Sequence, residues 1–149
     1  MCMNIGRQWT DRLRIWAAQF EKHYLLNIKP LDVAYYKTME HLPFAEAVKG
    51  NFVPLPVGTQ WGKKWEYGWF RAEFTLPEVC EGRRVVLLPG VGGEQLIYVD
   101  GVARGSNDKG RDYVTLRMEG RAGENVSVLV ESYAGHGARL ENLGPCPPE

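Results

Sequence analysis

The segment from Trp61 to Pro77 constrains the fold of this chain more than any other. It holds three of the five tryptophans, next to glycines, and then becomes a strict alternation. One side carries Phe70, Ala72, Phe74 and Leu76, and the other side carries Trp69, Arg71, Glu73 and Thr75. Alternation with a period of two is the pattern of a strand that buries one face. The sequence therefore predicts a strand from Phe70 to Leu76.

Several more short strands are predicted downstream, with turn signals between them. Their ranges are Arg84–Leu88, Glu94–Val99, Val102–Arg104, Tyr113–Met118 and Val126–Tyr133. Asp100-Gly101 between two of them is the strongest hairpin signal in the chain, and residues 105–110 read as a polar loop. Short strands repeating about every ten residues indicate an antiparallel β-sandwich of the jelly-roll, galactose-binding-like type.

An amphipathic helix is predicted from Thr10 to Leu26, with Thr10 as its N-cap. Its apolar stripe consists of Trp9, Leu13, Trp16, Phe20 and Tyr24. Such a stripe is expected to pack on a sheet or on a neighbouring domain. From Lys29 to Gly58 the pattern is irregular and rich in proline, which suggests a connecting arm with one short helical turn at Phe44–Val48.

These elements divide the chain into three parts. Residues 1–57 form the helix and an arm packed on the sandwich, residues 58–140 form the sandwich, and residues 141–149 form an extended exit segment.

Composition narrows the possible partners and compartment. The 149 residues include 18 basic and 18 acidic side chains, so charge gives no argument for nucleic acid or an anionic membrane surface. No apolar run has the length of a signal peptide core or a membrane span. The three cysteines are scattered and form no Cys-x-x-Cys or Cys/His cluster, so we expect no metal site and a reduced, cytoplasmic setting.

The order of motifs resembles the N-terminal β-domain of family 38 glycoside hydrolases, the class II α-mannosidases. The resemblance runs from Pro56 to Gly137. It is carried by Gly58-Thr59-Gln60-Trp61-Gly62, Trp69-Phe70-Arg71, Glu94, Asp100-Gly101, Asp108-Lys109-Gly110-Arg111-Asp112-Tyr113 and Glu131-Ser132-Tyr133-Ala134-Gly135-His136-Gly137. The resemblance implies a non-catalytic accessory domain that supports the catalytic domain of the same polypeptide and contacts mannose-containing oligosaccharides.

The same resemblance implies that the chemistry lies elsewhere in such an enzyme. The family's catalytic domain holds zinc or a similar divalent ion with two His and two Asp, in a stretch that begins with His-Ile-Asp. The histidines of this chain are His23, His41 and His136, and none stands in that motif. No recognisable pair of catalytic carboxyl groups is present either. We therefore assign no catalytic residue and no cofactor to this chain.

Trp61, Trp65 and Arg71 are the candidate sugar-binding residues, because a pyranose C–H face fits an indole and a guanidinium donates to hydroxyls. Trp69 and His136 are candidates for contact with another domain. The tryptophans would also suit burial at one end of the sandwich, Arg71 a cross-strand ion pair, and His136 a local hydrogen bond.

Two alternative functions remain open at this point. One is a free-standing carbohydrate-binding module. The other is the sugar-binding jelly roll of a family 2 β-glycosidase, which Trp69-Phe70-Arg71 before Leu76-Pro77 also resembles.

Overall fold

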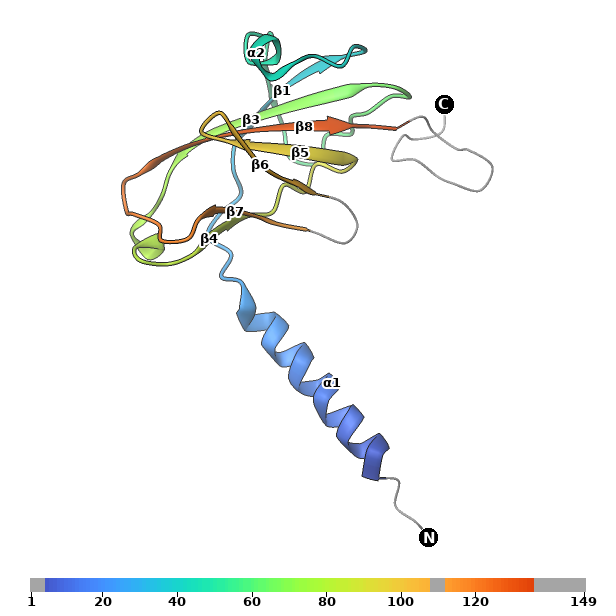
Figure 1. Ribbon diagram of the computed structural model, residues 1–149, viewed down its shortest axis with the longest axis vertical. Coiled ribbons are helices and arrows are strands. Elements are labelled where there is room, and N and C mark those ends of the chain that lie inside the picture. The colour runs from blue at the N-terminus through green and yellow to red at the C-terminus, as the bar shows by residue number, and fades with distance from the viewer. Residues whose placement is uncertain (1–4, 108–111, 136–149) are drawn as a thin grey trace. The chain divides into compact units, whose positions relative to one another are not determined.

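The computed structural model describes residues 5–107 and 112–135 (Figure 1). The chain divides into two compact units, Met1–Pro30 and Leu31–Glu149, which are described separately. In chain order the elements are α1 (Ile5–Tyr24), β1 (Val33–Thr38), α2 (Phe44–Ala47), β2 (Val53–Leu55), β3 (Tyr67–Thr75), a 3-10 turn (Glu78–Cys80), β4 (Val85–Leu87), β5 (Glu94–Val99), β6 (Val102–Asn107), β7 (Val114–Arg117) and β8 (Asn125–Tyr133). His136 and the predicted exit segment 141–149 lie outside the described residues.

The first unit contains the predicted helix, but the helix begins earlier than its sequence suggests. α1 starts at Ile5, and the Thr10 hydroxyl donates a hydrogen bond to the Gly6 carbonyl, 2.9 Å away. Thr10 is therefore inside the helix, bonded back by one turn, and its assignment as N-cap is wrong. The side chains of the stripe, Trp9, Leu13, Trp16, Phe20 and Tyr24, are exposed. In the described part of the chain, no helix has the length and apolar character needed to cross a membrane.

The second unit is a β-sandwich, as predicted. Within the described residues, a six-stranded sheet has the order β2-β1-β3-β8-β5-β6, and β4 pairs with β7 in a second sheet. All these strand pairs are antiparallel. The central pair is β3 with β8, which stay in register from Tyr67↔Tyr133 to Thr75↔Asn125. The mainly β, jelly-roll fold class is confirmed.

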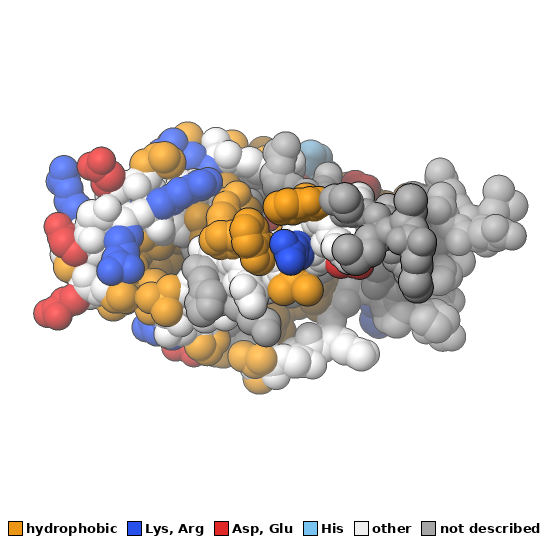
Figure 2. Space-filling model, turned by 90° about the horizontal axis from the view of Figure 1, so that it is seen from below, with side chains coloured by type: hydrophobic (Ala, Val, Ile, Leu, Met, Phe, Trp, Pro, Cys, Tyr) orange, Lys and Arg blue, Asp and Glu red, His pale blue; other side chains and the backbone are white. Residues whose placement is uncertain are grey.

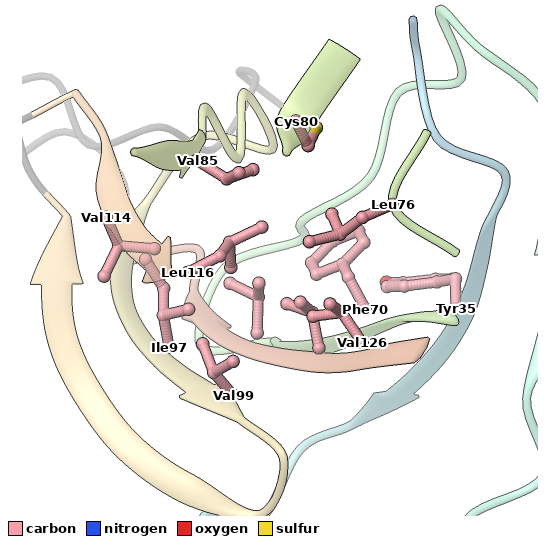
Figure 3. Close-up of a cluster of buried hydrophobic side chains, with 12 residues drawn as sticks. Tyr35, Phe70, Leu76, Cys80, Val85, Ile97, Val99, Val114, Leu116 and Val126 are labelled. Carbon is pink, nitrogen blue, oxygen red and sulfur yellow. The ribbon is translucent and has the colours of Figure 1, made fainter. Parts of the chain in front are cut away.

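The main hydrophobic core lies between the two sheets (Figure 3). Phe70 of β3, Ile97 of β5 and Val126 of β8 face Val85 of β4 and Leu116 of β7. These residues alternate along their strands with side chains that point to the other face, so the period-two pattern places the core correctly. Burial of such aliphatic and aromatic side chains stabilises a fold by roughly 1.5–3 kcal/mol each.

A second hydrophobic cluster covers the opposite, outer face of the six-stranded sheet. Its buried members are Ala47, Trp69 and Leu129, with Tyr36, Leu42, Phe44, Val48, Phe52 and Tyr98 packed around them. The segment that follows β1 and includes α2 supplies most of this cover. β3 is consequently buried on both faces between Gly68 and Phe70, rather than on one face only.

The arm predicted as irregular contributes two strands to the sheet. β1 pairs with β3, and the short β2 adds the outermost strand, with Pro54 at the sheet edge, where its missing N–H is tolerated. The alternation of β1 is masked because Tyr35 faces the main core while its neighbour Tyr36 faces the second cluster. The predicted helical turn is confirmed as α2.

The Asp100-Gly101 hairpin is confirmed, and β6 extends to Asn107, so residues 105–107 are strand and not loop. Asp100 and Gly101 both have positive φ, 51° and 78°, as a type I′ turn requires. The Asp100 carboxylate accepts hydrogen bonds from the Ser127 N–H at 3.0 Å and from Arg117 at 2.6 Å. The hairpin is thereby joined to β8 and β7.

We predict that Asp100→Ala lowers the free energy of unfolding by about 1–2 kcal/mol, because two donors lose their acceptor and alanine disfavours positive φ. Burial alone would raise the Asp100 pKa, but hydrogen bonds from Ser127 and Arg117 and the charges of Arg117 and Arg104 lower it below its usual value. This stabilisation is complete above the unfolded pKa and is lost as pH falls through the folded pKa.

Urea denaturation across acid pH measures the effect. The difference between wild type and Asp100→Ala should shrink below about pH 4. The free energy of unfolding of Asp100→Asn should lie between those of wild type and Asp100→Ala, because asparagine tolerates positive φ but lacks the charge. A difference that is constant with pH would contradict the role of the carboxylate.

Candidate functional site

A tight turn between Trp61 and β3 displays the most exposed indole of the sandwich. The Glu66 N–H donates to the Lys63 carbonyl at 2.9 Å, which closes a four-residue turn. Trp65 has φ +67°, whereas Lys64 does not have positive φ. This combination defines a type II turn, in which glycine or asparagine is preferred at the position that Trp65 occupies. The Trp65 residue is 48% exposed, and Lys63 and Lys64 are exposed beside it.

The turn is held by the segment that follows β8. The Trp65 N–H donates to the Gly135 carbonyl at 2.7 Å, and the Ala134 N–H donates to the Glu66 carbonyl at 2.9 Å. Gly62, at φ +90°, packs so closely that an added Cβ would lie 2.9 Å from the Ala134 side chain. The backbone of the turn is therefore fixed on both sides.

Beneath the turn, Glu66 has a structural partner. The Tyr35 hydroxyl donates to Glu66 Oε1 at 2.6 Å, and both residues are buried. Burial raises the pKa of Tyr35 above its usual value, and the hydrogen bond to Glu66 and its charge raise it further. The phenol stays protonated and remains a donor, so the pair holds the turn against β1.

Trp61 is part of the core's edge rather than an exposed surface. Its indole N–H donates to the Val91 carbonyl at 2.6 Å, and its ring meets Phe70 edge-on with centroids 4.9 Å apart. Its ring lies 6.1 Å from that of Tyr35. These contacts attach the glycine-rich loop before β5 to the sandwich.

Arg71 and Trp69 belong to the outer face. The Arg71 guanidinium lies 3.9 Å from the centroid of the Phe52 ring, a cation–π contact, and within the described residues no ion pair of Arg71 is found. Trp69 is fully buried in the second cluster, and its indole nitrogen has no hydrogen-bond partner among residues 5–107 and 112–135. Trp61 and Arg71 thus lie on opposite faces of the sheet, and the structure does not bring the three predicted sugar-binding residues onto one surface.

A histidine–carboxylate pair on the outer face was missed by sequence reasoning. His41 Nε2 lies 2.9 Å from Glu131 Oε1, and the His41 ring stacks near that of Tyr67. Burial raises the pKa of Glu131, and the His41 charge and hydrogen bond partly oppose this. The available signal was an acidic residue directly after the apolar run Val126–Val130 and within the same predicted strand, but nothing in the sequence identified its partner.

The two carboxylates that are buried among residues 5–107 and 112–135 do not form a catalytic pair. Glu66 bonds to Tyr35 of the inner core, whereas Glu131 faces outward next to His41. Retaining glycoside hydrolysis needs two carboxyl groups about 5 Å apart on one site. Among residues 5–107 and 112–135, no group of three His, Cys, Asp or Glu side chains could hold a metal ion.

The topology and core define the class of this protein as a jelly-roll β-sandwich domain. Residues 28–146 match the family model described as "Alpha-mannosidase, jelly roll domain", of the Ams1-like type. The chain belongs to this family of α-mannosidase jelly-roll domains, and the resemblance to the N-terminal β-domain of family 38 enzymes is confirmed.

Two curated relatives agree with this assignment. Alpha-mannosidase 2C1 of Mus musculus is 42% identical over 71 residues, which are 48% of this chain and 7% of the relative. Alpha-mannosidase 2C1 of Homo sapiens is 37% identical over 100 residues, which are 64% of this chain and 10% of the relative. The chain therefore spans a tenth or less of the length of these relatives.

We predict that Tyr35→Phe lowers the free energy of unfolding by about 1–3 kcal/mol, because the buried Glu66 carboxylate loses its donor. Tyr36→Phe is the matched control on the other face of the same strand and should change stability by less than about 0.5 kcal/mol. Denaturant unfolding of both variants measures the difference. Equal effects of the two substitutions would refute a specific role of the Tyr35–Glu66 bond.

A second prediction concerns Glu131. Its pKa is raised in the folded state, so the folded protein loses stability as pH rises from the unfolded pKa through the folded value. Glu131→Gln removes this loss, and its stability relative to wild type should rise as the pH increases above about pH 4. Glu94→Gln, an exposed carboxyl on the neighbouring strand, is the control. Parallel pH profiles of wild type and Glu131→Gln would contradict the prediction.

Proposed function

We propose that this chain is a non-catalytic accessory domain of a family 38 α-mannosidase and supports the catalytic part of that polypeptide. The match of residues 28–146 to an α-mannosidase jelly-roll model is the observation that carries this proposal. The buried carboxylates support it, because each is engaged with a partner of its own on a different face of the sheet. In this proposal glycoside hydrolysis and the divalent ion belong to the catalytic part, and the enzyme is cytoplasmic.

The exposed stripe of α1 supports a docking role. Trp9, Trp16 and Phe20 are each more than half exposed, at 56%, 58% and 73%. Exposed aromatic stripes on a helix are typical of surfaces that meet another protein part. Figure 2 shows hydrophobic side chains standing at the molecular surface among Lys and Arg side chains. The occupant that we propose for the α1 stripe is the remainder of the α-mannosidase polypeptide, which makes up nine tenths or more of the relatives' length.

A domain exchange tests the proposal. The segment of human Alpha-mannosidase 2C1 that matches this chain is either deleted or replaced by this chain, and hydrolysis of an aryl α-mannoside is measured with the melting temperature. Deletion should abolish hydrolysis or lower the melting temperature of the rest of the enzyme. Replacement by this chain should restore part of the lost activity or stability. The isolated chain should show no hydrolysis.

A variant of the exchanged enzyme tests the docking surface. Trp16→Ser with Phe20→Ser should lower the melting temperature of the exchanged enzyme, because apolar contact area is lost. The same changes in the isolated chain measure any loss of stability that does not involve the rest of the enzyme. Hydrolysis by the isolated chain, or a deletion that alters neither activity nor stability, would refute the accessory role.

A further inference from the structure

We infer that Trp65 is a sugar-stacking residue and that the type II turn from Lys63 to Glu66 is built to present it. The ligand class is an oligosaccharide that carries α-linked mannose, and this choice of sugar rests on the proposed function. The inference moves the sugar contact away from Trp61 and Arg71, which lie on opposite faces of the sheet, and assigns it to one residue of a defined turn.

The backbone of Trp65 provides the first argument. A bulky residue with positive φ is a conformational outlier, and the left-handed region costs an L-residue free energy that glycine does not incur. Glycine or asparagine would fit this turn position without strain. The indole contributes exposed surface at this position, with 48% of the residue accessible. Strain of this kind is concentrated at functional sites, where the surrounding structure holds it in place.

The surroundings of the turn provide the second argument. The bonds from Trp65 to Gly135 and from Ala134 to Glu66 hold the turn to the segment after β8, and the Tyr35–Glu66 bond holds it to β1. A turn whose backbone is held in this way loses little backbone conformational entropy when a ligand binds. Such preorganisation increases affinity for a small, polar ligand that offers little apolar area.

The chemistry around the indole favours a sugar over a protein partner. The indole face is electron-rich and accepts the polarised C–H groups of one pyranose face. Thr59, Gln60, Lys63 and Lys64 nearby in the chain are exposed and can donate hydrogen bonds to hydroxyls. Lysine is depleted at the cores of protein interfaces. Two lysines directly before the only strongly exposed tryptophan among residues 31–107 and 112–135 therefore fit a hydroxyl-rich ligand better.

Nuclear magnetic resonance of the full 149-residue chain tests the assignment. The indole N–H signals and the backbone N–H signals of residues 59–68 are followed while an α-linked mannobiose is added, with cellobiose as the control sugar, so that a response can still be detected in variants that lack the Trp65 indole. The Trp65 signal should shift in a saturable manner with mannobiose, and the signals of Trp61 and Trp69 should move much less. Trp65→Ala should abolish the saturable response, and Trp16→Ala, which removes a similarly exposed indole from α1, should leave it intact.

Trp65→Asn separates a binding role from a packing role. Asparagine tolerates positive φ, so this variant should melt at or above the wild-type temperature, by up to roughly 2–4 °C, while its response to mannobiose is lost. A clear drop in melting temperature would show that Trp65 serves packing and would overturn the inference.

The remaining outcomes are also decisive. No saturable shift of Trp65 with mannobiose, or an equal shift with cellobiose, would overturn the assignment to mannose. A Trp65→Ala effect confined to the stability of the exchanged Alpha-mannosidase 2C1 would assign the residue to a protein contact instead. Saturable binding by the isolated chain together with a failed domain exchange would refute the accessory role and leave this inference standing.

Discussion

The pairing of β3 with β8 is the interaction on which the rest of the structure depends. The two strands stay in register over their whole length and occupy the centre of the six-stranded sheet. Their alternate side chains supply both hydrophobic clusters, Phe70 and Val130 to the inner one and Trp69 and Leu129 to the outer one. Because the side-chain period of a strand is two, a slip of one residue would exchange the two sets and disrupt both clusters at once.

This central pair also explains where the polar groups of the chain are found. Tyr67 opposite Tyr133 begins the register, and the turn before Tyr67 meets the segment after Tyr133 through backbone hydrogen bonds. At the other end, the Asp100 carboxylate bonds to the Ser127 N–H and joins the β5–β6 hairpin to the same strand. These polar contacts therefore lie at the two ends and on the outer face of the β3–β8 pair, and the pair determines their positions.

The sequence predicted the parts whose signals are local. Strict alternation identified β3, and Asp100-Gly101 identified its hairpin because only a few residue types accept two successive positive φ values. β1 escaped prediction because tyrosines on both of its faces erase the alternation, and β2 because it is three residues long and contains Pro54. The outer-face cluster that buries Trp69 was not predicted, because its cover comes from the segment around α2, which is distant in sequence. Pairing between distant segments is a tertiary property that periodicity does not encode.

The sequence predicted the candidate site from residue types alone. In the structure, the site is distinguished by the backbone conformation of Trp65. Three aromatic or cationic side chains close in sequence suggested one platform. However, Trp61 lies in the loop before β3 and packs beside Phe70 of the inner core, whereas Arg71 lies over Phe52 on the outer face. What distinguishes Trp65 is its φ, and a residue of this kind gives no sign of it in the sequence. A strained conformation persists only where surrounding contacts outweigh its cost, and here those contacts come from Gly135, Ala134 and the Tyr35–Glu66 bond. The buried Glu66 is thus better understood as the support of a turn than as a catalytic acid, because its one strong partner fixes the backbone that presents the neighbouring indole.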